Sequence, residues 1–341
     1  MNTPINRQLI LSAYAHDLPG DEHFSLRETV IPVPEDGQVL VKVVLLSMDP
    51  APRMRMSGAI GGMPQLPLDT VMIGRGIGRV IESRHAQIPV GAAVMGELGW
   101  QEYACIAGDG LRVLDLSLGA LPEHLGVLGN SGLAAYFAVR QGQVNAGETL
   151  VLNAAAGSVG SAAGQIARLH GARVIGIAGG DVQMRYLRDA LGFDAAVDYQ
   201  AADFPAQLAA VLPDGVDVFL DLVGGDTHDA VMRHLNVHAR IVLIGTISNY
   251  NLAAGETDRG PRHLLTWINK RVRLSGFLVG DYAAEFPNAM RQLAAWLHDG
   301  SVKSRLTMFD GLTSCPQAFR ALFGSQSVGK VLVMVEDSPH A

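Results

Sequence analysis

Cysteine is scarce in this sequence, with Cys105 and Cys315 the two among 341 residues. So few thiols argue against a disulfide framework and a four-cysteine zinc site, and they favour a reducing cytoplasm as the location. Charged residues are also sparse, at 17%, and the net charge is −7. An acidic chain has no attraction for nucleic acid or for an anionic membrane. With 48% hydrophobic residues, the composition predicts a soluble globular protein that acts on small molecules.

Three sequence features of other protein classes are missing as well. Polar residues interrupt the small-residue stretch 150–167, so no membrane span is expected. The eleven histidines show no zinc-ligand spacing, because His234 and His238 lie where a helix should give way to a strand, and no metal is expected. The absence of a Gly-x-Ser-x-Gly element argues against a serine hydrolase.

Residues 1–125 are expected to form a β-rich domain. Short runs rich in β-branched residues alternate there with proline and glycine turn signals. The predicted strands are Arg7–Ala13, Phe24–Val30, Gln38–Ser47, Val71–Glu82, Gly91–Gly96 and Trp100–Ile106.

Residues 126–300 alternate between strand and helix patterns. Repeated β-α-β units predict an α/β domain with a Rossmann doubly wound parallel sheet. Residues 301–341 become strand-rich again and are expected to return to the first domain, ending in the strand Val328–Val335. The predicted strands of the α/β domain are Thr149–Asn153, Arg173–Ala178, Val216–Val223 and Arg240–Ile244, and the predicted helices are Ser158–His170, Gln183–Leu191 and Asp226–Leu235.

A glycine-rich loop, Ala154-Ala155-Ala156-Gly157-Ser158-Val159-Gly160, joins the first of these strands to the first helix. It matches the dinucleotide-binding fingerprint, with Ala155 at the first glycine position. Gly157 lets the backbone come close to a pyrophosphate, and Gly160 lets the helix pack tightly on the strand. The helix N-terminus then offers free N–H groups to the phosphates. This setting favours a dinucleotide site over a tight turn without a ligand.

The end of the second strand separates NAD from NADP. An NAD site places an acidic residue there to bind the ribose hydroxyls, and this chain has Ala178-Gly179-Gly180 instead. Arg185 and Tyr199 are candidates to bind a 2′-phosphate, whereas Asp181 is a candidate helix cap. The sequence therefore favours NADPH as the cofactor.

At this loop the sequence resembles the medium-chain dehydrogenase/reductase superfamily, and more narrowly its zinc-independent branch of prostaglandin reductases, leukotriene B4 dehydrogenases and curcumin reductases. The resemblance covers nearly the whole chain. It implies a GroES-like catalytic domain at the N-terminus and the NADPH-dependent reduction of alkenals and alkenones without a metal. Gly74-Arg75-Gly76 stands where zinc-binding members carry Gly-His-Glu. The resemblance rests on the glycine-rich loop with Ser161 and on Ser47-Met48-Asp49-Pro50, Arg53, Met56, Leu128-Gly129, Gly132-Leu133, Ala135-Tyr136-Phe137, Leu191-Gly192-Phe193-Asp194, Gly224-Gly225, His238-Ala239-Arg240-Ile241, Ile247-Ser248, Tyr250-Asn251, Gly276-Phe277 and Gly329-Lys330.

The resemblance also implies which residues contact the cofactor. The glycine-rich loop would bind the pyrophosphate, Tyr199 would lie near the 2′-phosphate, and the segments 244–250 and 277–279 would line the nicotinamide half. The candidate cofactor residues are Asn130, Ala134, Gly157, Ser158, Val159, Gly160, Gly179, Gln183, Arg185, Tyr199, Leu222, Ile244, Gly245, Thr246, Ile247, Ser248, Tyr250, Phe277, Leu278, Val279 and Ser327.

Five positions depart from the pattern of this branch. Gln183 replaces a lysine on the 2′-phosphate, which weakens the prediction of NADPH, although Arg185 could compensate. The others are Leu222 and Ser327 in place of asparagine, Ala51 in place of tyrosine and Asn130 in place of methionine. Ala51 and Asn130 are expected to reshape the substrate pocket.

Tyr250 is the side chain singled out for chemistry. In one interpretation it packs in the site and bonds to ribose. In the other, its hydroxyl donates to the substrate carbonyl while hydride passes from nicotinamide C4 to the β-carbon, and Tyr250 or water protonates the α-carbon. The candidate substrate-pocket residues are Asp49, Ala51, Arg53, Asn130 and Tyr250.

Three functions remain open from the sequence. The first is a reductase of the C=C bond of enones and enals, and the second is an NADPH:quinone reductase with the same zinc-free architecture. The third is a nicotinamide-nucleotide sensor without turnover, since several polar groups that orient ligands are missing. The resemblance also implies a homodimer, in which the apolar strand Arg271–Leu278 could pair across a two-fold axis.

Overall fold

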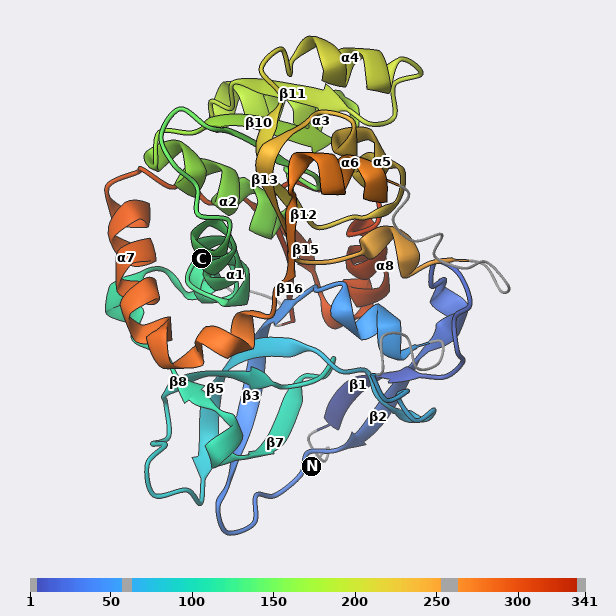
Figure 1. Cartoon of the computed structure of the whole chain (residues 1–341). Helices are drawn as coiled ribbons and strands as arrows, with labels where there is room; N and C mark the ends of the chain where they lie inside the picture. The colour runs from blue at the N-terminus through green and yellow to red at the C-terminus, as the bar shows by residue number, and fades with distance from the viewer. Residues whose placement is uncertain (1–4, 57–62, 253–262, 336–341) are drawn as a thin grey trace. The chain divides into compact units, whose positions relative to one another are not determined.

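The computed structural model describes residues 5–56, 63–252 and 263–335. The chain divides into two compact units. Unit 1 comprises residues 1–125, 306–323 and 330–341, and unit 2 comprises residues 126–305 and 324–329. Figure 1 shows the elements of both units along the chain.

The described residues of unit 1 form two β-sheets. A three-stranded sheet has the order β2-β1-β4, and a seven-stranded sheet has the order β15-β16-β3-β5-β6-β8 with β7 paired to β3. The helix of this unit, α8 (Cys315–Ala321), packs Phe319 edge-on against the buried ring of Trp100. The strands are β1 (Ile5–Leu11), β2 (Phe24–Val30), β3 (Gln38–Ser47), β4 (Thr70–Val71), β5 (Arg75–Ser83), β6 (Ala93–Glu97), β7 (Tyr103–Ala107), β8 (Arg112–Val113), β15 (Leu306–Asp310) and β16 (Lys330–Met334).

The described residues of unit 2 form a six-stranded parallel sheet of order β11-β10-β9-β12-β13-β14. This is the doubly wound order, in which the direction of the crossovers reverses between β9 and β12. The strands are β9 (Thr149–Leu152), β10 (Arg173–Ala178), β11 (Ala195–Asp198), β12 (Val216–Asp221), β13 (Leu235–Leu243) and β14 (Arg273–Gly276).

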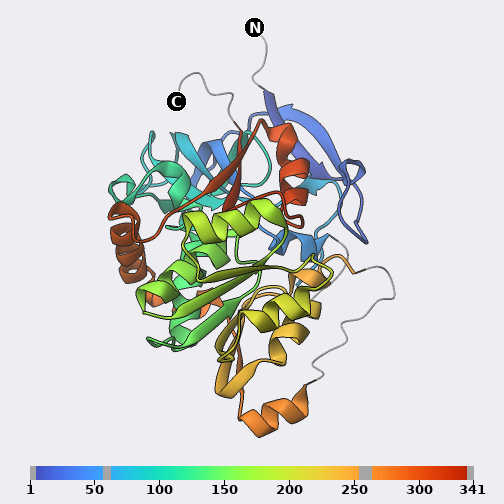
Figure 2. The ribbon, with the colours of Figure 1, turned by 90° about the horizontal axis from the view of Figure 1, so that it is seen from above.

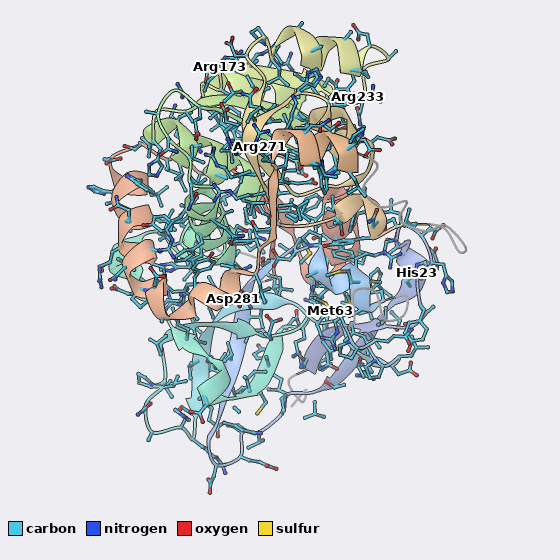
Figure 3. The ribbon with its side chains drawn as sticks, viewed as in Figure 1. His23, Met63, Arg173, Arg233, Arg271 and Asp281 are labelled. Carbon is cyan, nitrogen blue, oxygen red and sulfur yellow. The ribbon has the colours of Figure 1, made fainter. Side chains whose placement is uncertain are left out.

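Helices cover this sheet on both sides, as Figure 2 shows for unit 2. The strands β9 and β12 are therefore buried almost throughout and consist mainly of apolar residues. At the opposite, amino-terminal edge lies Arg173, the first residue of β10, which is labelled in Figure 3. Its guanidinium donates to the carbonyl oxygen of Val211, directly after α4, at 2.8 Å. The helices are α1 (Asn130–Gln141), α2 (Ser158–Leu169), α3 (Gly180–Arg185), α4 (Phe204–Ala210), α5 (Gly225–Met232), α6 (Leu264–Lys270) and α7 (Phe286–His298).

The fold class predicted from the sequence is confirmed, and several element boundaries are corrected. The predicted strand 71–82 is two strands, because β4 pairs with β1 whereas β5 belongs to the other sheet. The helix predicted at 183–191 begins at Gly180 and continues as a π-helical turn over Tyr186–Ala190.

The strand β13 begins five residues before the predicted start at Arg240. The helix predicted to run to Leu235 ends at Met232 instead. His238 has φ +66°, and the pairing of β13 with β12 shifts register in this stretch. An irregularity of this kind breaks the alternation of side chains, so the first half of the strand lacks a period-2 pattern.

Candidate functional site

Most candidate cofactor residues of unit 2 lie at one edge of its sheet. Parallel strands all end at the same edge, so the loops after them converge there. Each strand is followed by one or more of the candidates: residues 157–160 come after β9, Gly179 after β10, Tyr199 after β11, Leu222 after β12, residues 244–248 after β13 and Phe277 after β14.

The glycine-rich loop packs the start of α2 directly on β9. A Cβ at Gly160 would lie 2.5 Å from the carbonyl oxygen of Ala154 and 2.8 Å from the Cα of Ala155. Ala154 itself has φ +45°, a left-handed conformation that costs a non-glycine residue about 1 kcal/mol. A Cβ at Gly157 would meet only that same carbonyl oxygen within 4 Å, at 3.2 Å. The backbone at Gly157 is therefore open toward a ligand at the N-terminus of this 12-residue helix.

The turn after β10 is held by Gln183, at the position where the branch usually has lysine. Its amide oxygen accepts from the N–H of Gly179 at 3.0 Å, and its amide nitrogen donates to the carbonyl oxygen of Ser327 at 2.8 Å. The side chain is buried. Gln183 therefore ties the turn to the segment 324–329, and both ends of its amide are occupied.

Two neutral side chains missed by the sequence analysis stand beside this turn. A Cβ at Gly179 would lie 2.8 Å from the ring of Tyr199, 3.1 Å from Ser325 Cβ and 3.2 Å from Gln200 Cδ. Gln200 Nε2 also donates to the hydroxyl of Tyr199 at 3.4 Å. Arg185, the other candidate, is exposed on α3. Side chains that carry hydroxyl and amide groups thus lie beside Gly179.

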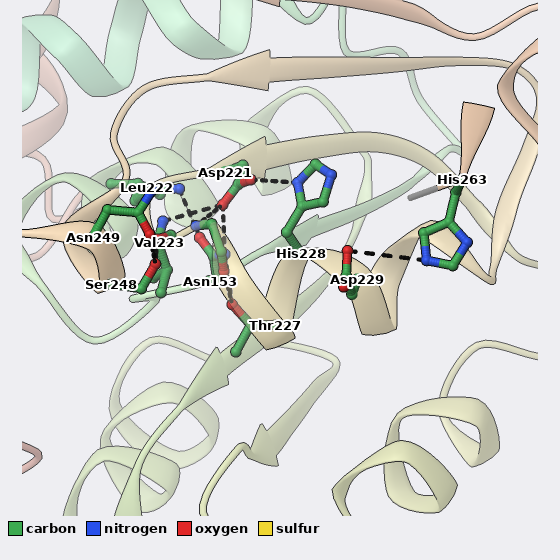
Figure 4. A network of polar contacts seen from close by, with 11 residues as sticks. Asn153, Asp221, Leu222, Val223, Thr227, His228, Asp229, Ser248, Asn249 and His263 are labelled. Carbon is green, nitrogen blue, oxygen red and sulfur yellow. Dashed lines mark hydrogen bonds and ion pairs between the residues drawn. The ribbon is translucent and has the colours of Figure 1, made fainter. Parts of the chain in front are cut away.

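The turn after β12 is held by a buried polar network (Figure 4). Asn153 Nδ2 donates to Asp221 Oδ1 at 2.7 Å and to Thr227 Oγ1 at 3.1 Å. His228 Nδ1 lies 2.6 Å from Asp221 Oδ2. Burial raises the pKa of Asp221, but hydrogen bonds from His228, the Gly224 N–H and Asn153 outweigh it and leave this pKa below its usual value. Asp221 is therefore a carboxylate at neutral pH.

The sequence analysis did not single out these network residues. The available signal was a polar residue at the end of a buried apolar strand, which both Asn153 and Asp221 provide. Leu222, which was singled out, contributes its backbone, because its N–H donates to Asn153 Oδ1 at 2.7 Å.

Tyr250 follows β13 at the end of a short 3-10 turn, Ile247–Asn249. Its backbone N–H donates to the carbonyl oxygen of Ile247 at 3.2 Å. Burial raises the pKa of its phenol, although hydrogen bonds with Thr246 act in the opposite direction. The hydroxyl is therefore protonated at neutral pH and able to donate a hydrogen bond.

Phe277 follows β14 beside an aromatic stack. Its ring lies 5.9 Å from that of Tyr282, which stacks on Phe137 at 4.5 Å and bonds through its hydroxyl to Gln141 at 2.8 Å. Leu278 is exposed, and Val279 is half-buried at the start of a 3-10 turn. The stack fixes the chain as it leaves the sheet.

The remaining candidates of unit 2 lie on α1 and on the segment 324–329. Asn130 is the exposed first residue of α1, and Ala134 is buried one turn later. Gly329, two residues after Ser327, donates its N–H to the carbonyl oxygen of Ala156 at 2.7 Å. The segment is therefore fixed against the glycine-rich loop.

The three candidates from unit 1, Asp49, Ala51 and Arg53, all follow β3, and the last two lie in the 3-10 turn Ala51–Arg55. The Asp49 carboxylate accepts from Lys330 Nζ at 2.6 Å and from Ser47 Oγ at 2.6 Å. Burial raises its pKa, but Lys330 and Ser47 outweigh this and lower it. Ala51 is exposed. Arg53 is fully buried and donates from Nη2 to the carbonyl oxygen of Asp17 at 2.8 Å, so its guanidinium holds the fold of this region.

A cavity of about 310 Å³ lies at the far, carboxyl end of α2. Its cationic side chains are used internally, since Arg168 donates to the carbonyl oxygen of Leu191 and Lys303 to that of Ala190, both at 3.0 Å. Within the residues that the structure describes, no group of three or more His, Cys, Asp and Glu side chains could hold a metal ion. Over the same residues, no helix is long and apolar enough to cross a membrane.

Comparisons with known proteins agree over nearly the whole chain. A family model described as the N-terminal domain of oxidoreductase matches residues 7–114, and one described as zinc-binding dehydrogenase matches residues 158–295. The NADPH-dependent curcumin reductase of Escherichia coli (strain K12) is 40% identical over 339 residues, which are 97% of each chain. The NADP(+)-dependent 2-alkenal reductase of Nicotiana tabacum is 33% identical over 338 residues, again 97% of each. The crystal structure of CurA in complex with NADPH from Vibrio vulnificus has a TM-score of 0.90 and 38% identity, covering 97% of this chain and 100% of that one.

The ion pair of Asp49 with Lys330 provides a test of unit 1. Lys330 is 3% exposed and Asp49 is 38% exposed, so Asp49→Asn leaves a buried ammonium without its counter-charge while water screens part of the loss. We expect the free energy of unfolding to fall by about 1–3 kcal/mol at pH 7, measured by urea denaturation. Asp109→Asn, which removes an exposed carboxylate, should cost less than about 0.5 kcal/mol.

The pH dependence of this loss follows from the lowered pKa of Asp49. A carboxyl whose pKa is lower in the folded chain stabilises the protein fully above its ordinary pKa of about 4, and this stabilisation disappears as the pH falls through the lowered value. The difference between wild type and Asp49→Asn should therefore shrink below about pH 4. A constant difference down to pH 3 would contradict the ion pair.

Proposed function

The chain belongs to the medium-chain dehydrogenase/reductase superfamily, in the zinc-independent branch of curcumin, prostaglandin and alkenal reductases, and on this premise we propose that it reduces the C=C bond of α,β-unsaturated ketones and aldehydes with NADPH. One observation carries the proposal. The glycine-rich loop, the neutral turn at Gly179 and the segment with Tyr250 all lie at the carboxyl edge of one parallel sheet. The relatives named as NADPH-dependent curcumin reductase and 2-alkenal reductase support the reaction class.

The residues of this edge fit a nicotinamide dinucleotide. The open backbone at Gly157 and the N-terminus of α2 would bind the pyrophosphate. Tyr199, Gln200 and Ser325 would surround the 2′-phosphate at the Gly179 turn, and the segment 244–250 would line the nicotinamide half. Two cysteines without a disulfide, Cys105 and Cys315, favour a reducing compartment such as the cytoplasm.

NADPH, when bound, supplies the hydride that is added to the β-carbon of the substrate. The protonated phenol of Tyr250 would donate a hydrogen bond to the carbonyl oxygen of the substrate, where negative charge develops. Tyr250 or a water molecule would then protonate the α-carbon. Because burial raises the pKa of this phenol, the proton that forms the hydrogen bond stays on its oxygen at neutral pH.

The role of Tyr250 predicts a rate effect without a binding effect. Tyr250→Phe removes the donor and keeps the ring, so we expect kcat with an enone to fall by about 10²–10³-fold, while the Kd for NADPH changes by less than about threefold. Steady-state NADPH oxidation and fluorescence titration measure the two quantities.

Tyr136→Phe is the matched control, because it removes a hydroxyl from α1 outside the candidate residues. Enones, enals and quinones are assayed in parallel with wild type. Turnover of quinones alone would overturn the C=C reductase, and NADPH binding without any turnover would indicate a sensor. Unchanged kcat in Tyr250→Phe would remove the proposed role of this phenol.

The neutral turn at Gly179 predicts a modest preference for NADPH over NADH. Gln183→Lys places a cation where the 2′-phosphate would lie, and a charge-assisted hydrogen bond contributes about 1.5–3 kcal/mol. Because the lysine cannot accept from the Gly179 N–H, part of this gain is lost. We expect the Kd for NADPH to fall by about three- to tenfold and the Kd for NADH to stay within about twofold, measured by fluorescence titration.

Salt provides a second readout of this variant. Salt screens the attraction between a lysine ammonium and a phosphate. NADPH binding by Gln183→Lys should therefore be more sensitive to ionic strength than NADPH binding by wild type. Gln207→Lys, which adds the same charge on the exposed face of α4, is the control. Equal tightening of NADPH and NADH by Gln183→Lys would place the 2′-phosphate elsewhere.

We propose a homodimer in which β14 pairs with its copy. Within the described residues β14 is the end strand of the sheet, and Leu274 on it is 40% exposed. On the adjacent helix α6, Leu265 and Ile268 are about 70% exposed (71% and 70%). A second copy of the same edge would pair with backbone groups of β14 and cover these side chains.

Leu274→Glu tests the dimer by placing like charges together near the two-fold axis. Sedimentation velocity should give a dimer for wild type and a monomer for this variant. Leu116→Glu, which changes an exposed leucine of unit 1, should remain dimeric. A monomeric wild type would overturn the proposal.

A further inference from the structure

Asn153 and Asp221 meet at the point where the sheet order reverses. Asn153 directly follows β9, Asp221 ends β12, and these two strands are neighbours. Both residues are fully buried, and a 2.7 Å hydrogen bond joins their side chains (Figure 4). Two polar side chains buried at the edge that would bind the cofactor need a reason to be there, since a hydrophobic pair would bury at a lower cost.

The two side chains accept from three consecutive backbone amides. The N–H of Leu222 donates to Asn153 Oδ1 at 2.7 Å, and the N–H groups of Val223 and Gly224 donate to Asp221 Oδ1 at 3.1 and 2.8 Å. These amides have left the sheet and find their acceptors in the side chains. The turn is thereby wound tightly enough that Gly224 has φ +72° and Gly225, the next residue, has φ +56°.

The turn after β12 in turn supports the segment that carries Tyr250. The carbonyl oxygen of Val223 accepts from the Ser248 N–H at 3.1 Å and from the Ser248 hydroxyl at 2.6 Å. The carbonyl oxygen of Leu222 accepts from the Ile247 N–H at 3.4 Å, and that of Ile247 accepts from the Tyr250 N–H at 3.2 Å. A continuous path of hydrogen bonds therefore leads from Asn153 and Asp221 to the backbone of Tyr250.

His228 explains why the acceptor is a carboxylate. Its Nδ1 lies 2.6 Å from Asp221 Oδ2 and leaves Oδ1 to the amides. Its ring is 12% exposed and lies among the rings of Phe219 and Trp267, at 5.9 and 6.3 Å. The neighbouring pair of Asp229 and His263, 4.0 Å apart, faces away from this network in Figure 4. The carboxylate of Asp221 is thus bonded to His228, to Asn153 and to the backbone amides of the turn.

We propose that Asn153 and Asp221 are positioning residues for the reduction, which fix the turn 222–225 and, through it, the place of Tyr250. The inference rests on the proposed function, because Tyr250 is the donor that the network would hold in place. A displacement of about 1 Å at a reacting group can cost about 10²-fold in rate. Removing either side chain should therefore lower kcat without weakening the contacts that bind the pyrophosphate.

The test compares Asn153→Ala and Asp221→Asn with Asp217→Asn. Asp217 lies on the same strand at its other end, where it likewise accepts a backbone N–H, that of Thr149, at 2.9 Å. For Asn153→Ala we expect kcat with an enone to fall by about 10- to 100-fold and the Kd for NADPH to change by less than about threefold. Asp221→Asn keeps the shape of the side chain, so its kcat should fall by less than that of Asn153→Ala. Asp217→Asn should keep the wild-type kcat even where its melting temperature falls equally.

A double variant shows whether the effect passes through Tyr250. Once Tyr250→Phe has removed the donor, misplacing that side chain has little further effect, so adding Asn153→Ala should lower kcat by less than about threefold. Losses that multiply fully would overturn the inference. So would an unchanged kcat in folded Asn153→Ala and Asp221→Asn.

A readout that needs no turnover separates this inference from the proposed function. Ultraviolet difference titration of wild type against Tyr250→Phe isolates the phenol of Tyr250, whose pKa is raised by burial. Asn153→Ala should move that pKa down toward the ordinary value of about 10, and Asp217→Asn should not. A wild type that reduces no enone or enal overturns the function alone, whereas an unmoved titration in Asn153→Ala overturns the positioning role.

Discussion

The parallel pairing of β9 with β12 is the constraint on which the candidate site depends. Crossovers run from β9 toward β10 and β11 on one side and from β12 toward β13 and β14 on the other. The loops at the carboxyl ends of β9 and β12 therefore diverge and leave their backbone groups without neighbours from a further strand. The glycine-rich loop and the Asp221 network meet this constraint differently. The loop leads into α2, whose first N–H groups have no partner within the helix, whereas the side chains of Asn153 and Asp221 accept from the amides of the turn after β12.

The hydrogen bonds from the turn amides to Asn153 and Asp221 make other conformations of this turn unfavourable. Leaving a fully buried N–H without an acceptor costs about 1–3 kcal/mol, and three half-buried N–H groups, those of residues 222–224, depend on Asn153 and Asp221. A turn with an alternative conformation would lose several of these bonds together. The network thus favours a single conformation of the turn that bonds to the segment carrying Tyr250, the proposed donor.

The sequence predicted what depends on local pattern and missed what depends on tertiary contact. Continuous apolar strands and the glycine loop were found because burial on both faces and a strand-to-helix turn leave a local signal. The irregular half of β13 around His238 was missed because its pairing shifts register. The bond between Asn153 and Asp221 joins residues 68 positions apart, and no spacing rule connects them. The family resemblance named Leu222 and Tyr250 but not the side chains that support their backbone.

Gln183 shows how a single departure from the family pattern changes the physics of recognition. A lysine attracts a 2′-phosphate by charge over several ångströms, whereas hydroxyl and amide groups act only at hydrogen-bond distance. Gln183 is engaged by Gly179 and Ser327, and the side chains that lie against Gly179 are the neutral Tyr199, Gln200 and Ser325. In the proposed site, water would therefore replace the phosphate at low cost when NADH binds. The missing acid after β10 removes the repulsion that would exclude NADPH, and the missing lysine removes the attraction that would exclude NADH. In the proposed site, selectivity would therefore depend on Tyr199, Gln200 and Ser325, which lie beside Gly179.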